Sequence, residues 1–358
     1  MTEERLRRLQ QKIRARKLDG IIISRLVNVR YLTGFTGSAG WLLVTPEEAA
    51  FYTDFRYEEQ ASQQVRGCRI VIARGSLLRS VGREVERRGL RLVAIESHHI
   101  TLDQKDELTR CAPRAEWVSA RRVVESLRVS KSADELDAIR RAVQIADEAF
   151  AEVVVTLRPG LAEREVARRL HRAMERRGAD GAAFETIVAS GFRSALPHGV
   201  ASAKKLATGE LIVIDFGAVY AGYCSDLTRT VCLGKANTEQ KRIYRIVREA
   251  QWRAEERLQA GLTGREVDAA AREHIAAQGY GDRFGHGLGH GVGMEVHEGP
   301  TLSRSSRTRL PAGSIVTIEP GIYIKGWGGV RIEDMALVAE GRCEVITSAP
   351  KPPRLPEI

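Results

Sequence analysis

The stretch Gly209-Glu210-Leu211-Ile212-Val213-Ile214-Asp215 decides the fold, because its pattern returns at Gly313-Ser314-Ile315-Val316-Thr317-Ile318-Glu319. Each stretch begins at a glycine, continues as a short apolar run and ends on an acid, which is typical of a buried strand. Asp215 and Glu319 are 104 positions apart in the chain. The pattern predicts an internal duplication that carries an acid at the same place twice.

A second repeat lies upstream of each of these strands. Gly160-Leu161-x-x-Arg164-Glu165-Val166 recurs as Gly261-Leu262-x-x-Arg265-Glu266-Val267, an offset of 101 residues. Each copy leads into a helical stretch, one ending at Gly178 and the other at Gly279. Each half is therefore expected to run helix, strand, turn, strand, and two such halves packed about a pseudo-twofold axis would form one curved sheet backed by helices.

A further acid follows each strand on its return partner. Asp226 lies 11 residues after Asp215, at the start of the expected strand 227–232. Glu333 lies 14 residues after Glu319, beyond a glycine-rich turn and within the expected strand 330–338. A hairpin can bring two such acids side by side, so we expect four acids to face one another.

Four carboxylates gathered on an apolar sheet predict a metal site. They would repel one another and lose hydration, at a cost of several kcal/mol for each unpaired ion, unless cations neutralise them. Because four acids exceed the needs of one ion, we expect a pair of ions about 3.5 to 4 Å apart. Segment 284–300 supplies the imidazole, since glycines alternate there with His286 and His290 and let the backbone bend inward.

The N-terminal third of the chain has a different pattern. Apolar runs at 20–24, 41–45, 49–54, 69–74 and 91–97 are expected to be strands, with helices at 56–65 and 77–89. The glycines of 34–40 lack the spacing of a phosphate-binding loop and are interpreted as a tight connection between strands. Ser132 and Glu135 have the form of a capping box that opens a long helix, so the domain boundary is expected at about 125–130.

Composition narrows the classes of protein. Hydrophobic residues make up 43% of the 358 residues and charged residues 28%, as in globular proteins, and no apolar run could span a bilayer. The formal net charge of +10 is dispersed among acids, which disfavours a nucleic-acid partner. The five scattered cysteines favour a reducing compartment, and the basic N-terminus, interpreted as an exposed first helix, lacks the features of a secretory signal. We therefore expect a cytoplasmic protein without membrane partners.

Four segments together resemble a known family. These segments are IDFGA with SDLTRT, GHGLGHGVGMEVHE, TIEPGIY and GGVRIEDMALV. They are similar to the pita-bread metallopeptidases of the Xaa-Pro dipeptidase and aminopeptidase P group, and the N-terminal part is similar to the creatinase-type domain of that group. The resemblance implies an α/β (α+β) fold with a creatinase-type domain at 1–126 and a pita-bread catalytic domain at 127–358.

The resemblance also implies a site. Carried over position by position, it gives five metal ligands: Asp215, Asp226, His290, Glu319 and Glu333. They would hold two divalent ions, with manganese expected first and cobalt, zinc or iron as alternatives.

Roles beside the metals are implied for a second set of residues. Glu319, His297 and His198 would be catalytic, and His198, His286, His297 and Arg331 would contact the substrate. Arg331 could instead pair with an acid of the sheet such as Asp334. The resemblance further implies a homodimer acting on peptides that contain proline.

Alternatives stay open at this point. In many dipeptidases of the family an arginine follows the His-Glu-x-Pro motif, whereas this chain has Thr301, which leaves dipeptidase and aminopeptidase specificity equally plausible. A non-catalytic peptide-binding or histone-binding module of the same fold, or a metal-free hydrolase like creatinase, would show gaps among the five ligands. Methionine aminopeptidases share the ligand set but usually lack the full N-terminal domain.

Overall fold

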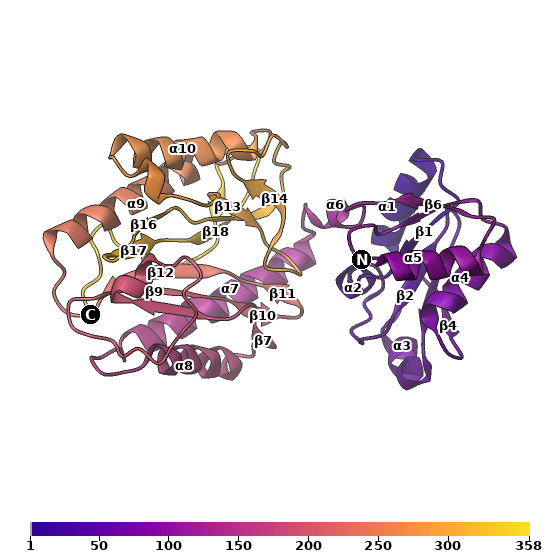
Figure 1. Ribbon diagram of the computed structural model, residues 1–358, viewed down its shortest axis with the longest axis horizontal. Helices are drawn as coiled ribbons and strands as arrows, with labels where there is room; N and C mark the ends of the chain where they lie inside the picture. Colours follow the sequence, from indigo (N-terminus) through magenta and orange to yellow (C-terminus); the bar gives the residue numbers. More distant parts are fainter. Residues whose placement is uncertain (1) are drawn as a thin grey trace. The chain divides into compact units, whose positions relative to one another are not determined.

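The computed structural model describes residues 2–358, which divide into two compact units, one ending at Arg128 and the other spanning Val129–Ile358 (Figure 1). The first unit contains six strands in one mixed sheet: β1 (Gly20–Ile23), β2 (Trp41–Val44), β3 (Ala49–Thr53), β4 (Arg69–Ile72), β5 (Leu92–Ile95) and β6 (Glu116–Ser119). Their order is β4-β3-β2-β1-β5-β6. β2 is antiparallel to both of its neighbours, and the pairs β3–β4, β1–β5 and β5–β6 are parallel.

The helices of the first unit are α1 (Thr2–Ala15), α2 (Leu26–Thr33), α3 (Glu58–Gln64), α4 (Leu77–Arg88), α5 (Leu102–Cys111) and α6 (Glu125–Arg128). All five strands expected in this part of the chain are present, as are the two helices at 56–65 and 77–89. The sequence prediction missed α2, α5 and β6. Glycines 34–40 therefore follow a helix, and Gly34 ends α2 in the left-handed conformation at φ 85° rather than joining two strands directly.

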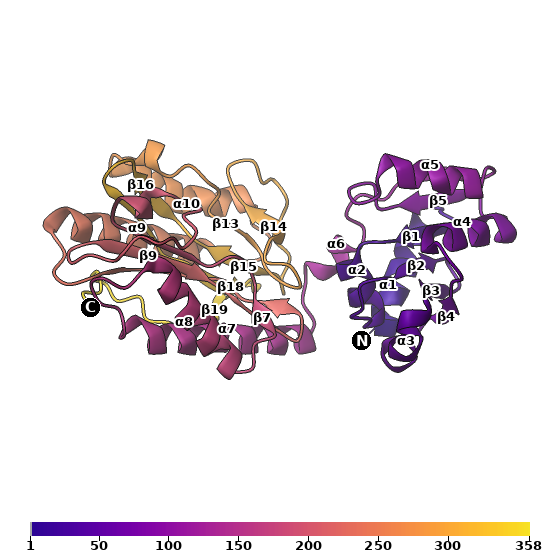
Figure 2. The same cartoon turned by 60° about the horizontal axis from the view of Figure 1, so that its bottom comes forward.

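The second unit has two long helix pairs: α7 (Ala133–Val154) with α8 (Glu163–Arg176), and α9 (Thr238–Arg257) with α10 (Gly264–Ala277). The strands lie between these pairs, with α7 and α8 on one side and α9 and α10 on the other (Figures 1 and 2). Each pair packs apolar residues on the strands of its own half of the chain, and α7 also packs through Ile139 and Val143 on Ile315 and Met335 of the other half. The capping box expected at Ser132 and Glu135 opens α7.

The two halves contain equivalent three-stranded ladders. In the first half β9 (Leu211–Phe216) pairs on its two edges with β8 (Ile187–Ser190) and β12 (Leu227–Cys232). In the second half β15 (Ile315–Ile318) pairs on its two edges with β13 (Gly289–Gly291) and β18 (Asp334–Leu337). Smaller strands complete the unit: β7 (Gly181–Ala182), β10 (Ala218–Tyr220), β11 (Tyr223–Cys224), β14 (Glu298–Leu302), β16 (Gly321–Ile324), β17 (Gly328–Arg331) and β19 (Glu344–Val345).

Hydrogen bonds repeat between the halves and confirm the duplication. The amide of Gly160 donates to the carbonyl of Leu206, and the amide of Gly261 donates to that of Leu310. The segment 330–338, expected to be one strand, is instead interrupted: β17 ends at Arg331 and β18 begins at Asp334. In this break the amide of Glu333 donates to the carbonyl of Thr228 on β12, which links the two halves at an expected ligand.

Candidate metal centre

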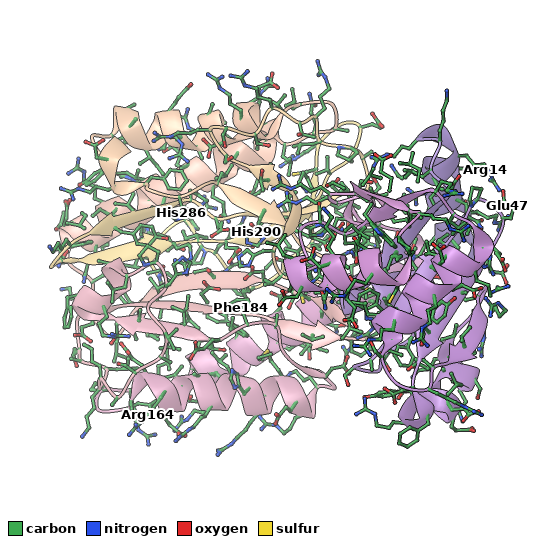
Figure 3. The ribbon with its side chains drawn as sticks, turned by 45° about the vertical axis from the view of Figure 1, so that its right-hand side comes forward. Arg14, Glu47, Arg164, Phe184, His286 and His290 are labelled. Atoms are coloured by element: carbon green, nitrogen blue, oxygen red, sulfur yellow. The ribbon has the colours of Figure 1, made fainter. Side chains whose placement is uncertain are left out.

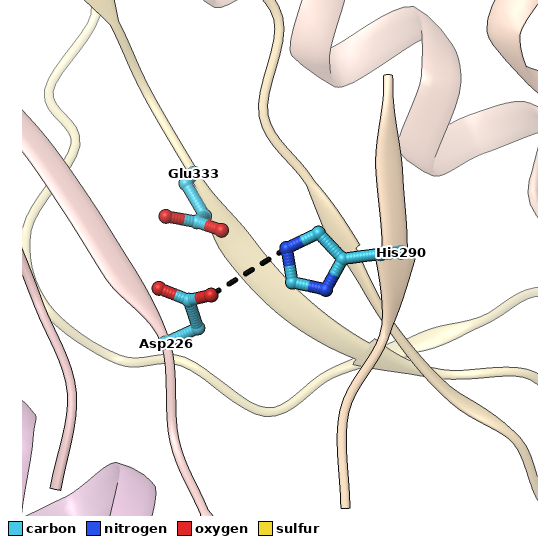
Figure 4. Close-up of side chains that lie close together, drawn as sticks. All are labelled: Asp226, His290 and Glu333. Carbon is cyan, nitrogen blue, oxygen red and sulfur yellow. Dashed lines mark ion pairs between the residues drawn. The ribbon is translucent and has the colours of Figure 1, made fainter. Parts of the chain in front are cut away.

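Three of the expected ligands form a compact cluster. One ligand atom from each of Asp226, His290 and Glu333 lies within 4.8 Å of the other two (Figure 4). Asp226 precedes β12, Glu333 lies in the break between β17 and β18, and His290 lies on β13. The cluster therefore draws on both halves of the duplicated unit, and its two acids are 5% and 2% exposed.

The neighbouring glycines and a hydrogen bond of its own ring position the imidazole of His290 beside the acids. A Cβ at Gly289 would lie 2.0 Å from the carbonyl oxygen of Thr317, so only glycine allows β13 this close to β15. Nδ1 of His290 lies 3.1 Å from the carbonyl oxygen of Gly291, and a carbonyl can only accept a hydrogen bond. In the neutral ring the proton is then on Nδ1, which leaves the lone pair of Nε2 facing the acids as a metal ligand requires.

The other two expected ligands lie on the wall of the same cavity. Oε1 of Glu319 is 3.3 Å from Nε2 of His290. Asp215 is the penultimate residue of β9, and its Oδ2 accepts a hydrogen bond from Nη2 of Arg331. Its Oδ1 is buried without a hydrogen-bond partner among residues 2–358. A buried carboxylate oxygen normally accepts a hydrogen bond or binds an ion. Because this part of the chain supplies no partner to Oδ1 of Asp215, a bound ion could take that place.

The electrostatics of the cluster fit divalent cations. Burial raises the pKa of Asp226 well above its usual range, and Glu333 and Asp215 raise it further. Burial also raises the pKa of Glu333 well above its usual range, together with Glu319 and Asp215. These raised pKa values favour the protonated form of both acids in the metal-free protein, and positive charge among them would favour loss of those protons. The mixed oxygen and imidazole donors suit Mn²⁺, Co²⁺, Fe²⁺ or Zn²⁺.

A cavity of about 770 Å³ opens beside this cluster. Figure 3 labels Phe184, from the first half, and His286 and His290, from the second, and all three line this cavity. Two cationic side chains are in its wall, Arg283 and Arg331. The size falls within the ordinary range for binding sites of small ligands.

The three further histidines predicted from the sequence all line the cavity. The ring of His297 lies against that of His290, with 4.2 Å between centroids and an angle of 56° between the ring planes. His198 lies exposed on the segment after β8. Nδ1 of His286 lies 2.7 Å from the carbonyl oxygen of Gly287, and its Nε2 lies 2.9 Å from the hydroxyl of Tyr323. All three rings thus stand where a bound molecule could contact them.

Arg331 pairs with Asp215, not with Asp334. The expected pairing of Arg331 with an acid of the sheet is confirmed, but Asp334 as its partner is wrong, because Asp334 is engaged by Arg229 at 2.8 Å. Nη1 of Arg331 also donates to the hydroxyl of Tyr323 at 2.9 Å. Burial raises the pKa of Tyr323 to about 12, so the hydroxyl stays protonated and can donate a hydrogen bond to Nε2 of His286.

Two contributors were missed in the sequence, Tyr323 and Thr228. Thr228 lies two positions after Asp226 and donates its hydroxyl to Oε2 of Glu333 at 2.7 Å. The signal for Thr228 was present, since a polar residue at alternate positions of an apolar strand shares the face of the acid. Tyr323 carried no such signal, because tyrosine is common in strands for packing alone.

Two parts of the chain match known protein families. Residues 137–340 match the model of metallopeptidase family M24, and residues 5–130 match the creatinase/prolidase N-terminal domain. An uncharacterized peptidase, YqhT, from Bacillus subtilis is 47% identical over 334 residues, covering 93% of this chain and 95% of that protein.

Solved structures agree with these family matches. An Xaa-Pro dipeptidase from Bacillus anthracis has a TM-score of 0.97 at 44% identity, covering 100% of both chains. An X-Pro aminopeptidase from Thermotoga maritima has a TM-score of 0.89 at 38% identity, covering 96% of this chain and 99% of that one. Within residues 2–358, no helix has the length and apolar character to cross a membrane. The chain is a member of metallopeptidase family M24 that carries a creatinase/prolidase N-terminal domain.

Proposed function

We propose that the protein is a two-metal hydrolase that removes the N-terminal residue from Xaa-Pro dipeptides, longer Xaa-Pro peptides or both. The supporting observation is the meeting of Asp226, His290 and Glu333 in the wall of a ligand-sized cavity. Relatives named Xaa-Pro dipeptidase and X-Pro aminopeptidase, similar over nearly the whole chain, support the substrate class.

Asp215, Asp226, His290, Glu319 and Glu333 would hold the ions, with manganese proposed first and cobalt, zinc or iron as alternatives. When bound, such ions would polarise a scissile carbonyl and lower the pKa of a water, so that it could lose a proton and attack near neutral pH. In the metal-free protein burial raises the pKa of Glu319, but the hydrogen bond and charge of a protonated His290 outweigh it, and the pKa is lowered overall. Beside bound cations Glu319 would be ionised as well, and it is suited to take the proton of the attacking water and pass it to the leaving proline nitrogen.

His297 and His198 are proposed to stabilise the oxyanion that forms on the substrate carbonyl. Burial lowers the pKa of His297, and the neighbouring His290 lowers it further, so the ring is neutral near pH 7 and can donate one N–H. His286 is proposed to contact the substrate from the Tyr323 side of the cavity. Arg331 would keep Asp215 in place, in addition to any contact with substrate.

Selectivity for proline must come from shape. The amide nitrogen of proline carries no hydrogen, so no acceptor in the site can recognise it. Phe184, Ile187 and Val200 supply apolar surface in the cavity wall against which a pyrrolidine ring can pack. A substrate without the ring would lose this contact.

Arg283 is the candidate for binding the carboxylate of a dipeptide. Thr301 replaces the arginine that many dipeptidases of the family have after the His-Glu-x-Pro motif, and Arg331 is already engaged by Asp215. Arg283 is exposed on the cavity wall and forms no ion pair within 4 Å among residues 2–358. A free carboxylate directly after proline would bring it the anionic partner it lacks.

The test compares hydrolysis of Ala-Pro, Ala-Pro amide and Ala-Pro-Ala by the metal-loaded protein and by Arg283→Ala. Arg283→Ala is expected to lower kcat/KM for Ala-Pro by roughly tenfold and to leave Ala-Pro amide nearly unchanged. Arg304→Ala, outside that cavity wall, is the matched control. A protein that binds no metal and cleaves none of the three peptides would be a binding module or a metal-free enzyme, and the proposal would be wrong. Homodimerisation and a cytoplasmic location stay predictions.

A further inference from the structure

Glu163, the first residue of α8, is fully buried and accepts five hydrogen bonds. Its Oε1 accepts from the amide and the hydroxyl of Ser190, at 2.8 and 2.9 Å. Its Oε2 accepts from the amide and the hydroxyl of Ser202, at 3.1 and 2.6 Å, and from Nε of Arg193 at 3.1 Å. One carboxylate therefore ties together both ends of the segment 191–201.

This segment, called here the His198 loop, reaches the cavity. His198 is on its wall together with Pro197 and Val200. The guanidinium of Arg193, held by Glu163, also donates to the carbonyl of Val200 at 2.7 Å. The carboxylate thus fixes the base of the loop and, through Arg193, a point two residues from His198.

The far side of the loop is fixed by the second half of the domain. The amide of Gly329 donates to the hydroxyl of Ser194 at 2.8 Å, and Nη1 of Arg331 donates to the carbonyl of Pro197 at 3.2 Å. Arg331 in turn holds Asp215, so the loop is clamped between Glu163 and a residue that contacts an expected metal ligand. Hydrogen bonds therefore tie the loop on both of its sides.

The position equivalent to Glu163 in the other half of the duplication carries no acid. The offset of 101 residues places Gly264 where the first half has Glu163. A Cβ at Gly264 would lie 2.0 Å from the carbonyl oxygen of Thr301, so α10 packs directly on its strand and has no room for a carboxylate. Glu163 therefore has no counterpart at the equivalent position of the second half. That half also brings a histidine, His297, to the cavity, but its buried acid, Asp268 on α10, accepts a hydrogen bond from the amide of Leu288 instead.

We propose that Glu163 is a positioning residue that holds the His198 loop, and through it the imidazole of His198, in the geometry that binds substrate. The proposal rests on the proposed function insofar as His198 contacts the peptide. Glu163 itself does not line the cavity. Its effect on catalysis must therefore pass through the loop.

Glu163→Gln tests the proposal, because glutamine keeps the shape of the side chain but offers one acceptor oxygen to five donors. Donors left without an acceptor in a buried site favour rearrangement of the loop. The matched control is Glu165→Gln, which removes a charge from the same helical turn, where the half-buried Glu165 forms ion pairs with Arg168 and Arg169 at 3.8 and 3.6 Å. Ser202→Ala, which removes a single donor, is the milder variant if Glu163→Gln does not fold.

The decisive measurement is a double-mutant cycle with His198→Ala on the metal-loaded protein, using Ala-Pro as substrate. Glu163→Gln is expected to lower kcat/KM by about tenfold in the parent protein and by less than about twofold in the His198→Ala background, with metal content unchanged. Ser202→Ala is expected to act in the same direction with a smaller factor. An equal loss in both backgrounds, or a loss of metal, would overturn the proposal.

Amide hydrogen exchange separates this proposal from the proposed function. Residues 191–201 are expected to exchange faster in Glu163→Gln than in the parent or in Glu165→Gln, whether or not Xaa-Pro peptides are cleaved. Unchanged exchange in this segment would contradict the role of Glu163 as a brace. An inactive parent protein whose segment 191–201 still loosens in Glu163→Gln would contradict only the proposed function.

Discussion

The hydroxyl of Thr228 donates a hydrogen bond of 2.7 Å to Oε2 of Glu333 and accepts one of 3.1 Å from Nε of Arg331. Thr228 belongs to the first half of the duplicated unit, and the other two residues belong to the second. A single hydroxyl therefore orients one expected metal ligand and the arginine that holds another. Residues that orient ligands in this way commonly matter for metal affinity almost as much as the ligands themselves.

Thr228→Val should weaken metal binding by about 10- to 100-fold, because valine keeps the volume but removes both hydrogen bonds. Titration of metal-stripped protein with Mn²⁺ measures the change. Thr228→Ser keeps the hydroxyl and should bind as the parent does. Equal Mn²⁺ affinity in all three proteins would mean that the hydroxyl of Thr228 does not contribute to metal binding by Glu333.

Asp226→Asn and Glu333→Gln should each lose bound metal and peptidase activity together, by at least about a hundredfold in metal affinity, since each removes a direct ligand. Metal analysis after gel filtration, with activity measured on the same sample, checks this. Glu344→Gln, at an exposed acid paired with Arg140, is the control and should change neither quantity. Full turnover by either metal-poor variant would remove both residues from the mechanism.

His297→Ala should lower kcat by roughly 10- to 1,000-fold while leaving the metal content nearly as it is, because the ring lies beside His290 without being needed as a ligand. Steady-state kinetics and metal analysis on one preparation decide the matter. A parallel fall in both quantities would place His297 among the ligands instead.

The strands of the fold could be predicted because their signals are local. The stretches ending at Asp215 and Glu319 are apolar, bounded by glycine and repeated, and the structure has β9 and β15 there. The sequence prediction missed α2 and β6, since a short helix such as Leu26–Thr33 and an edge strand such as Glu116–Ser119 are fixed by packing rather than by local pattern.

The cluster itself could be predicted only in part. Asp215 and Glu319 end repeated stretches of sequence, and a further acid follows each of them. This pattern predicts that the four carboxylates belong to one site. The break that sets Glu333 apart from β18 could not be foreseen, because it depends on Thr228 of the other half. Tyr323 and the Glu163 brace likewise depend on contacts between residues distant in the chain.

Between about pH 5 and 8, the metal-free protein should become less stable as the pH rises. Burial and neighbouring acids raise the pKa of Asp226 and of Glu333 in the folded state, above unfolded values of 3.8 and 4.5. In this window the unfolded chain therefore binds fewer protons than the folded one, and the free energy of unfolding falls with increasing pH. His290, whose pKa is raised overall because Glu319 outweighs the effect of burial, acts in the same direction.

Thermal unfolding of metal-stripped protein at several pH values measures this slope. Asp226→Asn should flatten it, because one of the groups with a raised pKa is gone. Saturation with metal should also flatten it, since bound cations displace the protons. A metal-free protein that gains stability as the pH rises from 5 to 8 would contradict the electrostatic account of the cluster.

The central claim is that carboxylates from two related halves, with one imidazole, form a site that works only with divalent cations. The most direct test strips the protein of metal, confirms the removal by elemental analysis, and measures cleavage of Ala-Pro and Ala-Pro-Ala before and after Mn²⁺ is restored. We predict no measurable cleavage by the stripped protein, and recovery as about two ions bind each chain. Cleavage at the original rate by protein shown to be free of metal would contradict the account.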